Sequence, residues 1–529
     1  MKLSLSSIKD TAQWQGYHLP AYDPAVIAAN TKAKPQWLHF GSGNIFRIFP
    51  AALCQRLIEK GSMDTGIVCC EGYDDEIITR CFRPYDNLTV GVTLNADGSI
   101  DKEVIGSMAE SLTMLHDSDQ VTEVFRQPSL QMVSFTITEK GYAVKNTQGE
   151  LMPIVKEDIA NGPGKSKHAM SFVAGLLYER YKAGKLPIAL VSMDNCSHNG
   201  EKLKSAVMTI ANGWHEAGHV DSGFIDYISD ESVVAFPWSM IDKITPRPSE
   251  KVQKMLEDMG MENIAPIITS KKTFIAPFVN AEQPQYLVIE DNFPNDRPAL
   301  EKAGVYLTDR DTVNKTERMK VTTCLNPLHT ALAVYGCMLG YTLICEEMKD
   351  SELTRLVNRL GYVEGLPVVT DPGIISPREF IDEVVKKRLP NPFMPDAPQR
   401  IATDTSQKVG IRFGETIKSY AALGRTSELK AIPLAIAGWL RYLLGVDDNG
   451  EPIEISADPL KDELCAHLAG IELGKPESYN GQLKDILSNE TIFGSDLCKL
   501  GMDKLIEEIF VKEISGKGAV RATLKEYLD

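Results

Sequence analysis

The sequence lacks a continuous apolar segment long enough to cross a membrane. Its most apolar helical stretch, residues 432–444, is interrupted by Arg441, whereas a bilayer requires about 20 apolar residues. The N-terminus also lacks the apolar core of a secretory signal, because charged residues stand at positions 2 and 9. We therefore expect a cytoplasmic protein without a membrane partner.

Metal-binding cysteine pairs and an excess of basic charge are also absent. The ten cysteines include no C-x-x-C pair, so neither a zinc ribbon nor a disulfide framework is expected, and no metal site is predicted. The 56 Lys and Arg residues are outnumbered by 72 Asp and Glu residues, which gives a formal charge of −16. Such a surface repels nucleic acid and anionic membranes. The expected partner is a small molecule, and the expected state is a monomer or small homo-oligomer.

Length and hydrophobic patterning predict an α/β protein of at least two domains. The chain has 529 residues, of which 43% are hydrophobic and 24% charged, and this length exceeds what one core usually organises. Up to about residue 297, short apolar strands alternate with helical segments, and a hairpin is expected across residues 95–98. Beyond that point helical periods dominate, for example over residues 313–344 and 404–423. We predict an α/β domain over residues 1–297 and a mainly α-helical domain over residues 298–529.

A glycine turn joins the first predicted strand, residues 36–40, to a helical segment that includes residues 51–61. Gly41 allows a tight turn, and Gly43 lets a pyrophosphate approach the main chain at a helix N-terminus, where unpaired N–H groups attract anions. The first domain is then a Rossmann-like, dinucleotide-binding domain, although a tight turn without a ligand is the simpler alternative. Phe46 stands where the usual fingerprint has its third glycine. The candidate cofactor-binding residues of the turn are Gly41, Gly43, Asn44, Ile45, Phe46 and Arg47.

Glu71 ends the second predicted strand, at the place where an acid can bind the ribose 2′-hydroxyl and repel a 2′-phosphate. This position favours NAD over NADP as the cofactor. Asp74 and Asp75 lie close enough in sequence to take the same role, and an acid in a turn can also be merely solvated.

The segment from Lys320 to His329 collects an amine, a carboxamide and an imidazole ahead of an apolar helical run. At 100° per residue, Asn326 and His329 share one face of a straight helix, while Lys320 lies about 180° from His329. Pro327 removes a helical hydrogen bond and clashes one turn back, so we expect a break or bulge near residues 325–327 that brings Lys320 round. In the simpler alternative, Asn326 and Pro327 only begin a helix and Lys320 is solvated.

Three further segments place polar groups where a ligand could bind. Asn195 follows a buried strand, at the edge where open α/β sheets bind ligands, although Asp-Asn is also an ordinary turn dipeptide. Asp242 interrupts an apolar stretch, and a surface ion pair with Lys243 is the alternative there. Arg400 and Lys408 share a helical stripe at i and i+8 with an acid midway between them. They form either an exposed salt-bridge ladder or, over a pocket, two cations that grip substrate oxygens.

These motifs together resemble the mannitol dehydrogenase family, the long-chain, polyol-specific NAD(P)-dependent dehydrogenases that include fructuronate and tagaturonate reductases. They occur in family order over most of the chain, at residues 41–47, 193–195 with 199–200, 239–246, 288–291, 320–329 and 400–408. The resemblance implies an N-terminal dinucleotide-binding domain, a mainly helical C-terminal domain, an active site in the cleft between them, and no metal.

The resemblance also implies roles for individual residues. It makes Lys320 the catalytic general base, with Asn195 and Asn326 holding the reacting oxygen, and it assigns substrate binding to His329, Asp242, Arg400 and Lys408. Two departures stand out. Ile45-Phe46-Arg47 replaces the Phe-His-Arg of the family, and the Lys-to-Asn and Lys-to-His separations of six and nine are one residue longer than usual.

The sequence therefore predicts an NAD-dependent oxidoreductase that interconverts a keto-sugar acid and its aldonate, with D-fructuronate and D-mannonate preferred. Mannitol 2-dehydrogenase, acting on mannitol and fructose, and tagaturonate reductase remain alternatives, because Arg400 and Lys408 occur in polyol enzymes too. A catalytically silent dinucleotide-binding protein is a third alternative, suggested by the altered glycine turn and the extra residue before Asn326.

Overall fold

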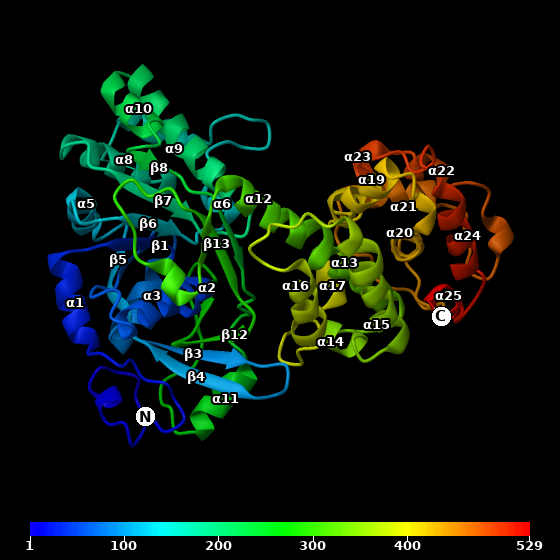
Figure 1. Ribbon diagram of the computed structural model, residues 1–529, viewed down its shortest axis with the longest axis horizontal. Coiled ribbons are helices and arrows are strands. Elements are labelled where there is room, and N and C mark those ends of the chain that lie inside the picture. Colours follow the sequence, from blue (N-terminus) through cyan, green and yellow to red (C-terminus); the bar gives the residue numbers. More distant parts are fainter. Residues whose placement is uncertain (165, 529) are drawn as a thin grey trace. The chain divides into compact units, whose positions relative to one another are not determined.

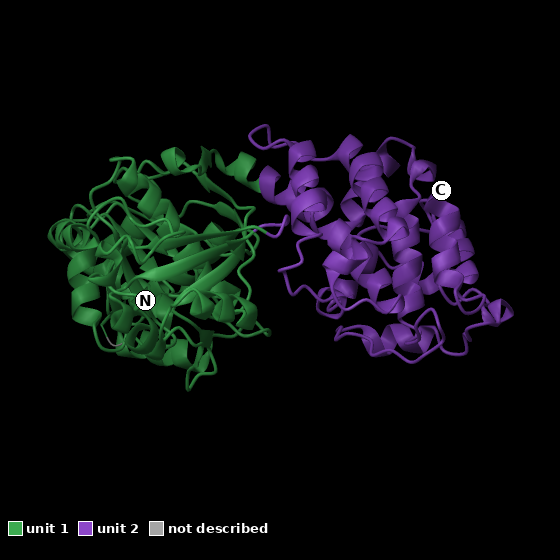
Figure 2. Cartoon of the chain, turned by 90° about the horizontal axis from the view of Figure 1, so that it is seen from below, with its two compact units in different colours: residues 1–94, 99–314 green, residues 95–98, 315–529 purple. Residues whose placement is uncertain are grey.

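The computed structural model describes residues 1–164 and 166–528, and the chain divides into two compact units (Figure 2). The first comprises residues 1–94 and 99–314, and the second comprises residues 95–98 and 315–529. The main division thus falls at 314/315, later than the expected 297/298. The reason is that β14 (Tyr306–Thr308) pairs in parallel with β13 (Tyr286–Glu290) and so extends the first unit.

The first unit is organised by a six-stranded sheet in which every neighbouring pair of strands is parallel. Its spatial order is β5-β2-β1-β6-β7-β8. Numbered within this sheet alone, that order is 3-2-1-4-5-6, the doubly wound arrangement of dinucleotide-binding folds, which confirms the predicted fold class. The strands are β1 (Trp37–Phe40), β2 (Ile67–Glu71), β5 (Met108–Thr113), β6 (Met132–Phe135), β7 (Ile188–Ser192) and β8 (Val234–Ala235).

Both faces of this sheet are covered. Along β1, Trp37 packs in one hydrophobic cluster, while Leu38 and Phe40 pack in the other, as the alternation of side chains along a strand requires. The cluster around Leu38 includes residues of α5 (Ser118–Arg126), α8 (Ala169–Lys182) and α9 (Asn199–Glu216). The cluster around Trp37 includes residues of α3 (Pro50–Glu59), β12 (Phe278–Glu282) and β13 (Figure 1).

Besides a two-stranded antiparallel sheet of β10 (Ile267–Ile268) and β11 (Phe274–Ile275), the first unit contains two three-stranded sheets. The expected hairpin is present, because β3 (Thr89–Leu94) pairs antiparallel with β4 (Ile100–Ile105), and β12 joins β3 in parallel. The strand expected near residue 285 is β13, but it lies outside the large parallel sheet. It pairs antiparallel with β9 (Ser239–Asp242), which forms part of the 239–246 motif.

The second unit is helical and is organised around α20 (Ala431–Tyr442). All twelve residues of α20 are buried, and the helix contacts α13 (Asn326–Met338), α24 (Asp503–Glu513) and α25 (Ala519–Leu528) (Figure 1). The apolar stretch over residues 432–444 is therefore a core helix, as expected. Within the described residues, none of the helices combines the length and the apolar character needed to cross a bilayer.

Two of the long helical stretches expected in this region are interrupted. Residues 313–344 contain the end of α12 (Arg310–Met319), a π-helical turn η5 (Lys320–Cys324) and then α13. Residues 404–423 contain a 3-10 turn η9 (Thr405–Gln407), α18 (Val409–Arg412) and α19 (Gly414–Ala422). Both interruptions fall on segments that hold candidate site residues, so they change the geometry expected from the sequence.

Candidate active site

The glycine turn follows β1 at the carboxyl edge of the parallel sheet. Gly41 has φ +103°, and a Cβ atom there would overlap the carbonyl oxygen of Thr136, so only glycine fits. Gly43 has no atom within 4 Å of the position that a Cβ would occupy. The two glycines therefore differ: Gly41 is required by packing, whereas the space beside Gly43 is open to a ligand such as a pyrophosphate.

Glu71, the last residue of β2, is tied to this turn. Its Oε2 accepts hydrogen bonds from the main-chain N–H of Ser42 at 3.0 Å and from the Ser42 hydroxyl, and its Oε1 accepts from the N–H groups of Tyr73 at 2.7 Å and Asp74 at 3.0 Å. The carboxylate thus lies at the position where dinucleotide-binding folds hold the adenosine ribose. Asp74, the alternative, is buried and accepts a hydrogen bond from Thr269 at 2.5 Å.

A hollow of about 600 Å³ opens beside the ends of β2 and β5. Gly72, Tyr73 and Leu115 belong to its lining, and the last two are large, exposed side chains. Lys271 Nζ stands 4.8 Å from the centroid of the Tyr73 ring. The size of the hollow and its place next to Glu71 suit the adenosine end of a dinucleotide.

The residues after the glycine turn need a correction. Phe46 is 0% exposed and stacks on His39, with the ring centroids 4.1 Å apart. Arg47 is also buried, and its guanidinium donates to the carbonyl of Ala276 and to Asn44 Oδ1, both at 2.7 Å. These two side chains are therefore part of the core that supports the turn, and the predicted cofactor contacts of Phe46 and Arg47 would have to use main-chain atoms. Asn44 and the partly buried Ile45 remain candidates for cofactor contact.

Asn195 lies on the loop that follows β7 at the same edge of the sheet. Its side chain is exposed, while the residues on either side of the loop are fixed. Asn199 Nδ2 donates to the carbonyls of Ser192 at 3.2 Å and Asp194 at 3.1 Å, and Asn199 Oδ1 accepts from the N–H of Ser239 at 3.0 Å. Asn195 is thus an amide presented by an anchored loop, which suits a group that must hold a reacting oxygen.

Asp242 ends β9 and is buried, so it is not part of a surface ion pair. Lys243 Nζ donates to the carbonyl of Glu282 and to Gln285 Oε1, both at 2.9 Å. The segment that follows reaches the glycine turn, since Asn44 Nδ2 donates to the carbonyl of Pro246 at 3.3 Å. This contact explains how two distant motifs meet in the first unit.

In the second unit, the expected interruption before Pro327 is a π-helical turn. Lys320 begins it, and the N–H of Leu325 donates to the Lys320 carbonyl at 3.1 Å, an i to i+5 hydrogen bond. Leu325 then leaves helical geometry with φ −130° and ψ −62°, and Asn326 begins α13. Such a turn takes one residue more than an α-helical turn. It therefore absorbs the extra residue between Lys320 and the two downstream polar groups.

Lys320 is 3% exposed, which contradicts the alternative of a solvated amine. The turn that holds it packs against a second π-helical turn, η6 (Arg359–Gly365). Gly365 allows this approach, because a Cβ there would lie 2.7 Å from Thr323 Cγ2. The wider turn therefore lies against η6, and the absence of a side chain at Gly365 permits this close packing.

His329 lies on the first turn of α13, three residues after Asn326. Its Nε2 is 3.0 Å from Asp396 Oδ2, and both side chains are 15% exposed. Burial alone would raise the pKa of Asp396, but His329 and Arg400 outweigh it and lower that pKa. Asp396 is therefore a carboxylate that lies beside the His329 ring, and no local sequence pattern indicates this pair.

The predicted stripe of Arg400 and Lys408 is wrong. Asp404, between them, adopts a left-handed conformation with φ +54°, so no continuous helix joins the two cations. The Arg400 side chain is 66% exposed and pairs with Asp396, while Lys408 is half-buried and donates to the carbonyl of Thr403. Arg400 and Lys408 are nevertheless close enough to interact electrostatically. Burial is the main cause that lowers the pKa of Lys408, the charge of Arg412 is the next, and the charge of Arg400 lowers it further.

Arg412 is a cation beside the start of α13 that the sequence motifs did not include. Its guanidinium donates to the hydroxyl of Thr330, whose own hydroxyl donates to the carbonyl of Asn326 at 2.9 Å. Burial lowers the pKa of Arg412 to about 10. This cation thus supports the start of α13, where Asn326 and His329 lie. No sequence motif links Arg412 to that helix, since the pairing spans 82 residues.

Across residues 1–164 and 166–528, three or more His, Cys, Asp or Glu side chains nowhere gather in a way that could hold a metal ion. The chemistry available to these residues is proton transfer and hydrogen bonding. A glycine turn and an acid lie at the edge of a doubly wound sheet, and a separate helical unit supplies groups for proton transfer. These features define the class of dinucleotide-dependent oxidoreductases.

Comparison with known proteins identifies the family. Models of the mannitol dehydrogenase Rossmann domain and of the mannitol dehydrogenase C-terminal domain match residues 35–302 and 312–512. The chain belongs to the mannitol dehydrogenase family. It is 54% identical to D-mannonate oxidoreductase of Thermotoga maritima, with 99% of both chains covered. It is 27% identical to mannitol 2-dehydrogenase of Neosartorya fischeri, with 93% of both covered.

Solved structures give the same answer for the fold. The chain is similar to a substrate-free D-sorbitol dehydrogenase, with TM-score 0.77, 27% identity, and 96% of this chain and 99% of that chain covered. It is also similar to mannitol 2-dehydrogenase of Pseudomonas fluorescens in a ternary complex with NAD and D-mannitol, with TM-score 0.70, 26% identity, and 100% and 99% covered. The resemblance seen in the sequence motifs is therefore confirmed over the whole chain.

Proposed function

We propose that this protein is an NAD-dependent oxidoreductase that interconverts a keto-sugar acid and its aldonate, with D-fructuronate and D-mannonate as the preferred pair. The observation that supports this most is the 54% identity to D-mannonate oxidoreductase of Thermotoga maritima over 99% of both chains. The relatives named for mannitol or sorbitol are only 26% to 28% identical.

NAD is the proposed cofactor, and it supplies or accepts the hydride when bound. The open space beside Gly43 gives a pyrophosphate access to the main chain. Glu71 is 5% exposed and accepts main-chain hydrogen bonds through both oxygens, and it places a negative charge at the end of β2, beside the position proposed for the adenosine ribose. An acid at the end of β2 repels the 2′-phosphate of NADP, which supports NAD. The ten cysteines are all free thiols, which supports a reducing, cytoplasmic location.

Lys320 is proposed to transfer the proton. In the reductive direction its ammonium donates to the forming alkoxide, and in the oxidative direction its neutral amine removes the hydroxyl proton. Its burial withdraws the amine from bulk water, as a group that exchanges a proton with substrate requires. Asn195 and Asn326 donate hydrogen bonds to the same oxygen and stabilise its negative charge. The remaining substrate oxygens are assigned to His329, Asp242, Arg400 and Lys408.

Initial rates with NADH on D-fructuronate, D-tagaturonate and D-fructose test this proposal. We expect the highest kcat/KM on D-fructuronate, and a kcat/KM with NADPH about tenfold or more lower than with NADH. Activity on fructose alone would assign the protein to the polyol dehydrogenases. NADH binding without turnover on any of the three ketoses would instead identify a silent dinucleotide-binding protein.

A further inference from the structure

One carboxylate in the first unit links the loops that follow two neighbouring strands. The Asp194 side chain, after β7, accepts from the main-chain N–H of Ile137 at Oδ2 and from that of Thr138 at Oδ1, both at 2.9 Å. These two residues follow β6. The hydroxyl of Tyr142 donates to Asp194 Oδ2 at 2.6 Å. Asp194 thus uses both oxygens to bind the turn after β6.

That turn is strained. Thr138 has φ +64°, a left-handed conformation that is rare for a β-branched residue and costs about 1–3 kcal/mol. The N–H of Thr138 donates to the Asp194 carboxyl. Burial raises the pKa of Asp194, and the hydrogen bonds from Tyr142, Ile137 and Thr138 oppose this shift, so they favour the charged carboxylate. The contacts of Asp194 therefore explain how a threonine is held in a conformation that glycine would adopt freely.

The strained turn also touches the glycine turn. The N–H of Thr136 donates to the carbonyl of Phe40 at 2.9 Å, and the Thr136 carbonyl leaves no space for a side chain at position 41. His39 Nε2 is within hydrogen-bond distance of Thr136 Oγ1, at 2.8 Å. The turn after β6 is therefore in contact with the turn after β1, where the cofactor is proposed to bind.

On its other side, Asp194 immediately precedes Asn195. The far end of that loop is fixed independently, because a Cβ at Gly200 would lie 2.7 Å from the carbonyl oxygen of Phe236. The position of the near end depends on the Asp194 side chain and on the hydrogen bond that Asn199 donates to the main-chain carbonyl of Asp194. One side chain thus connects the proposed cofactor turn to the amide proposed to hold the reacting oxygen.

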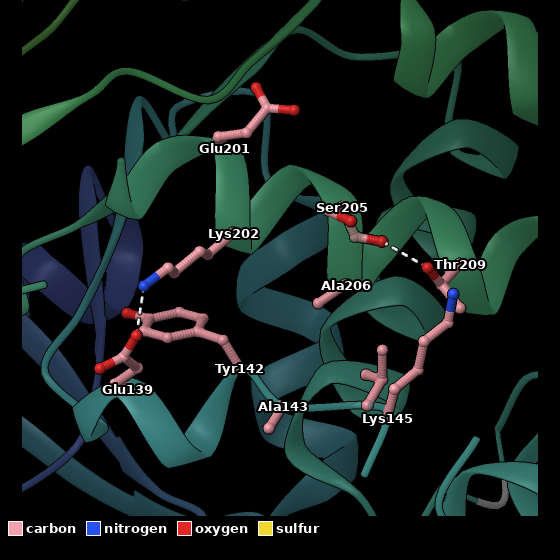
Figure 3. A pocket seen from close by; sticks show the side chains of 10 residues that line it. Glu139, Tyr142, Ala143, Lys145, Glu201, Lys202, Ser205, Ala206 and Thr209 are labelled. Atoms are coloured by element: carbon pink, nitrogen blue, oxygen red, sulfur yellow. Dashed lines mark hydrogen bonds and ion pairs between the residues drawn. The ribbon is translucent and has the colours of Figure 1, made fainter. Parts of the chain in front are cut away.

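Tyr142, which follows the strained turn in the sequence, also binds the Asp194 carboxylate. Its hydroxyl also lies 2.8 Å from Ser192 Oγ, and burial together with the nearby Asp194 charge raises the pKa of Tyr142 well above its usual value. The phenol therefore stays protonated and donates to Asp194. Figure 3 shows the Tyr142 ring beside the ion pair of Glu139 and Lys202, in a hollow of about 410 Å³ between α6 (Thr138–Gly141) and α9.

We propose that Asp194 is a positioning residue: its carboxylate clamps the strained turn at Thr138 and so fixes Asn195 relative to the glycine turn for hydride transfer. The proposal rests on the proposed function, because Asn195 is assigned to the reacting oxygen there. Asp194 itself has no catalytic role, since both of its carboxylate oxygens are engaged with the protein.

The Asp194→Asn variant tests the clamp, because the amide keeps the shape but its NH₂ group cannot accept from a main-chain N–H. We expect kcat to fall about 30-fold, while KM for the ketose and Kd for NADH change less than about threefold. Adding Thr138→Gly should restore about tenfold of the lost kcat, because glycine adopts the left-handed conformation without strain. General destabilisation would not produce this split between kcat and KM.

Asp221→Asn is the matched control. Asp221 Oδ1 also accepts from a tyrosine hydroxyl, that of Tyr181 at 2.8 Å, and from a main-chain N–H, that of Phe224 at 3.1 Å. It caps α10 (Ser222–Ser229) and has no contact with the Thr138 turn in the hydrogen bonds described here. Its substitution should change kcat less than about twofold.

Hydrogen–deuterium exchange of the peptide that covers residues 136–142 provides a readout independent of turnover. Asp194→Asn should accelerate exchange at Ile137 and Thr138, and Asp221→Asn should not. Unchanged exchange, a wild-type kcat, or a loss of kcat that Thr138→Gly does not relieve would each overturn the clamp. A wild-type protein that reduces no ketose would refute the proposed function, and the exchange measurement would still decide on the clamp.

Discussion

Glu513 offers the most quantitative prediction, because it is a carboxyl group enclosed in the core of the helical unit. It lies on α24 and is 0% exposed. Tyr335 donates to its Oε1 at 2.7 Å, and its Oε2 is buried without a hydrogen-bond partner among the described residues. Burial raises the pKa of Glu513 from 4.5 to about 8, despite the opposing effects of Tyr335 and Arg441. The side chain is therefore protonated in the native state at neutral pH.

The sign of the pH dependence follows from this shift. Below pH 4.5 the carboxyl is protonated in both the folded and the unfolded state, and between 4.5 and about 8 only the folded state retains the proton. The free energy of unfolding therefore decreases as pH rises through this window, by about 1.4 kcal/mol per pH unit. The total loss is on the order of 5 kcal/mol by pH 8 and does not grow further above it.

Glu513→Gln removes this dependence, because the amide is neutral at every pH and its oxygen still accepts from Tyr335. Relative to the wild type, the variant should gain stability by about 1.4 kcal/mol per pH unit between about pH 5 and pH 8. Urea unfolding followed by far-ultraviolet circular dichroism at several pH values measures the difference, using the transition of the helical unit.

Glu507→Gln is the control on the same helix. Glu507 also accepts from a tyrosine, with Tyr479 Oη at 2.6 Å, but its side chain is only partly buried. Its substitution should leave the pH dependence of the wild type in place. A difference between Glu513→Gln and wild type that stays constant from about pH 5 to pH 8 would refute the reasoning.

Three further substitutions separate the parts of the site. Gly43→Ala adds a methyl group where the protein has no atom within 4 Å. Fluorescence titration should show that NADH binds about tenfold more weakly, while Tm is unchanged. A changed Tm with wild-type affinity would contradict the open pyrophosphate space. Asp396→Asn removes the carboxylate that lies 3.0 Å from His329. Steady-state kinetics should show that KM for the ketose rises about tenfold. An unchanged KM would exclude His329 from substrate binding. Gly365→Ala forces a methyl group against the π-helical turn η5. We expect kcat to fall about tenfold while the affinity for NADH stays constant. A wild-type kcat would show that turnover does not require this turn geometry.

Features with local sequence signals were predictable. The glycine turn, the first two strands and the hairpin across residues 95–98 all appear where the residues indicate them, because tight turns and alternating apolar residues depend on near neighbours. The interruption before Pro327 was predictable for the same reason. Its π-helical form was not, since the order of residues around Pro327 does not distinguish a wider turn from a break in the helix.

The errors came from reading periodicity as continuous structure. Arg400 and Lys408 have helical spacing, but the left-handed Asp404 between them breaks the helix, and spacing alone carries no information about φ. The place of Phe46 in the glycine turn likewise carried no information about its side chain, whose ring packs on His39. Partners such as Asp396 and Arg412 escaped notice because their pairings span 67 and 82 residues.

The central claim is that Lys320 exchanges the proton during hydride transfer, and single-turnover kinetics of Lys320→Ala test it most directly. The variant is mixed with NADH and D-fructuronate, and NADH absorbance is followed over one turnover, with Kd for NADH measured separately by fluorescence. We expect the hydride-transfer rate to fall by about 10³-fold, with Kd for NADH within about twofold of wild type. A hydride-transfer rate within about tenfold of wild type would show that another group moves the proton.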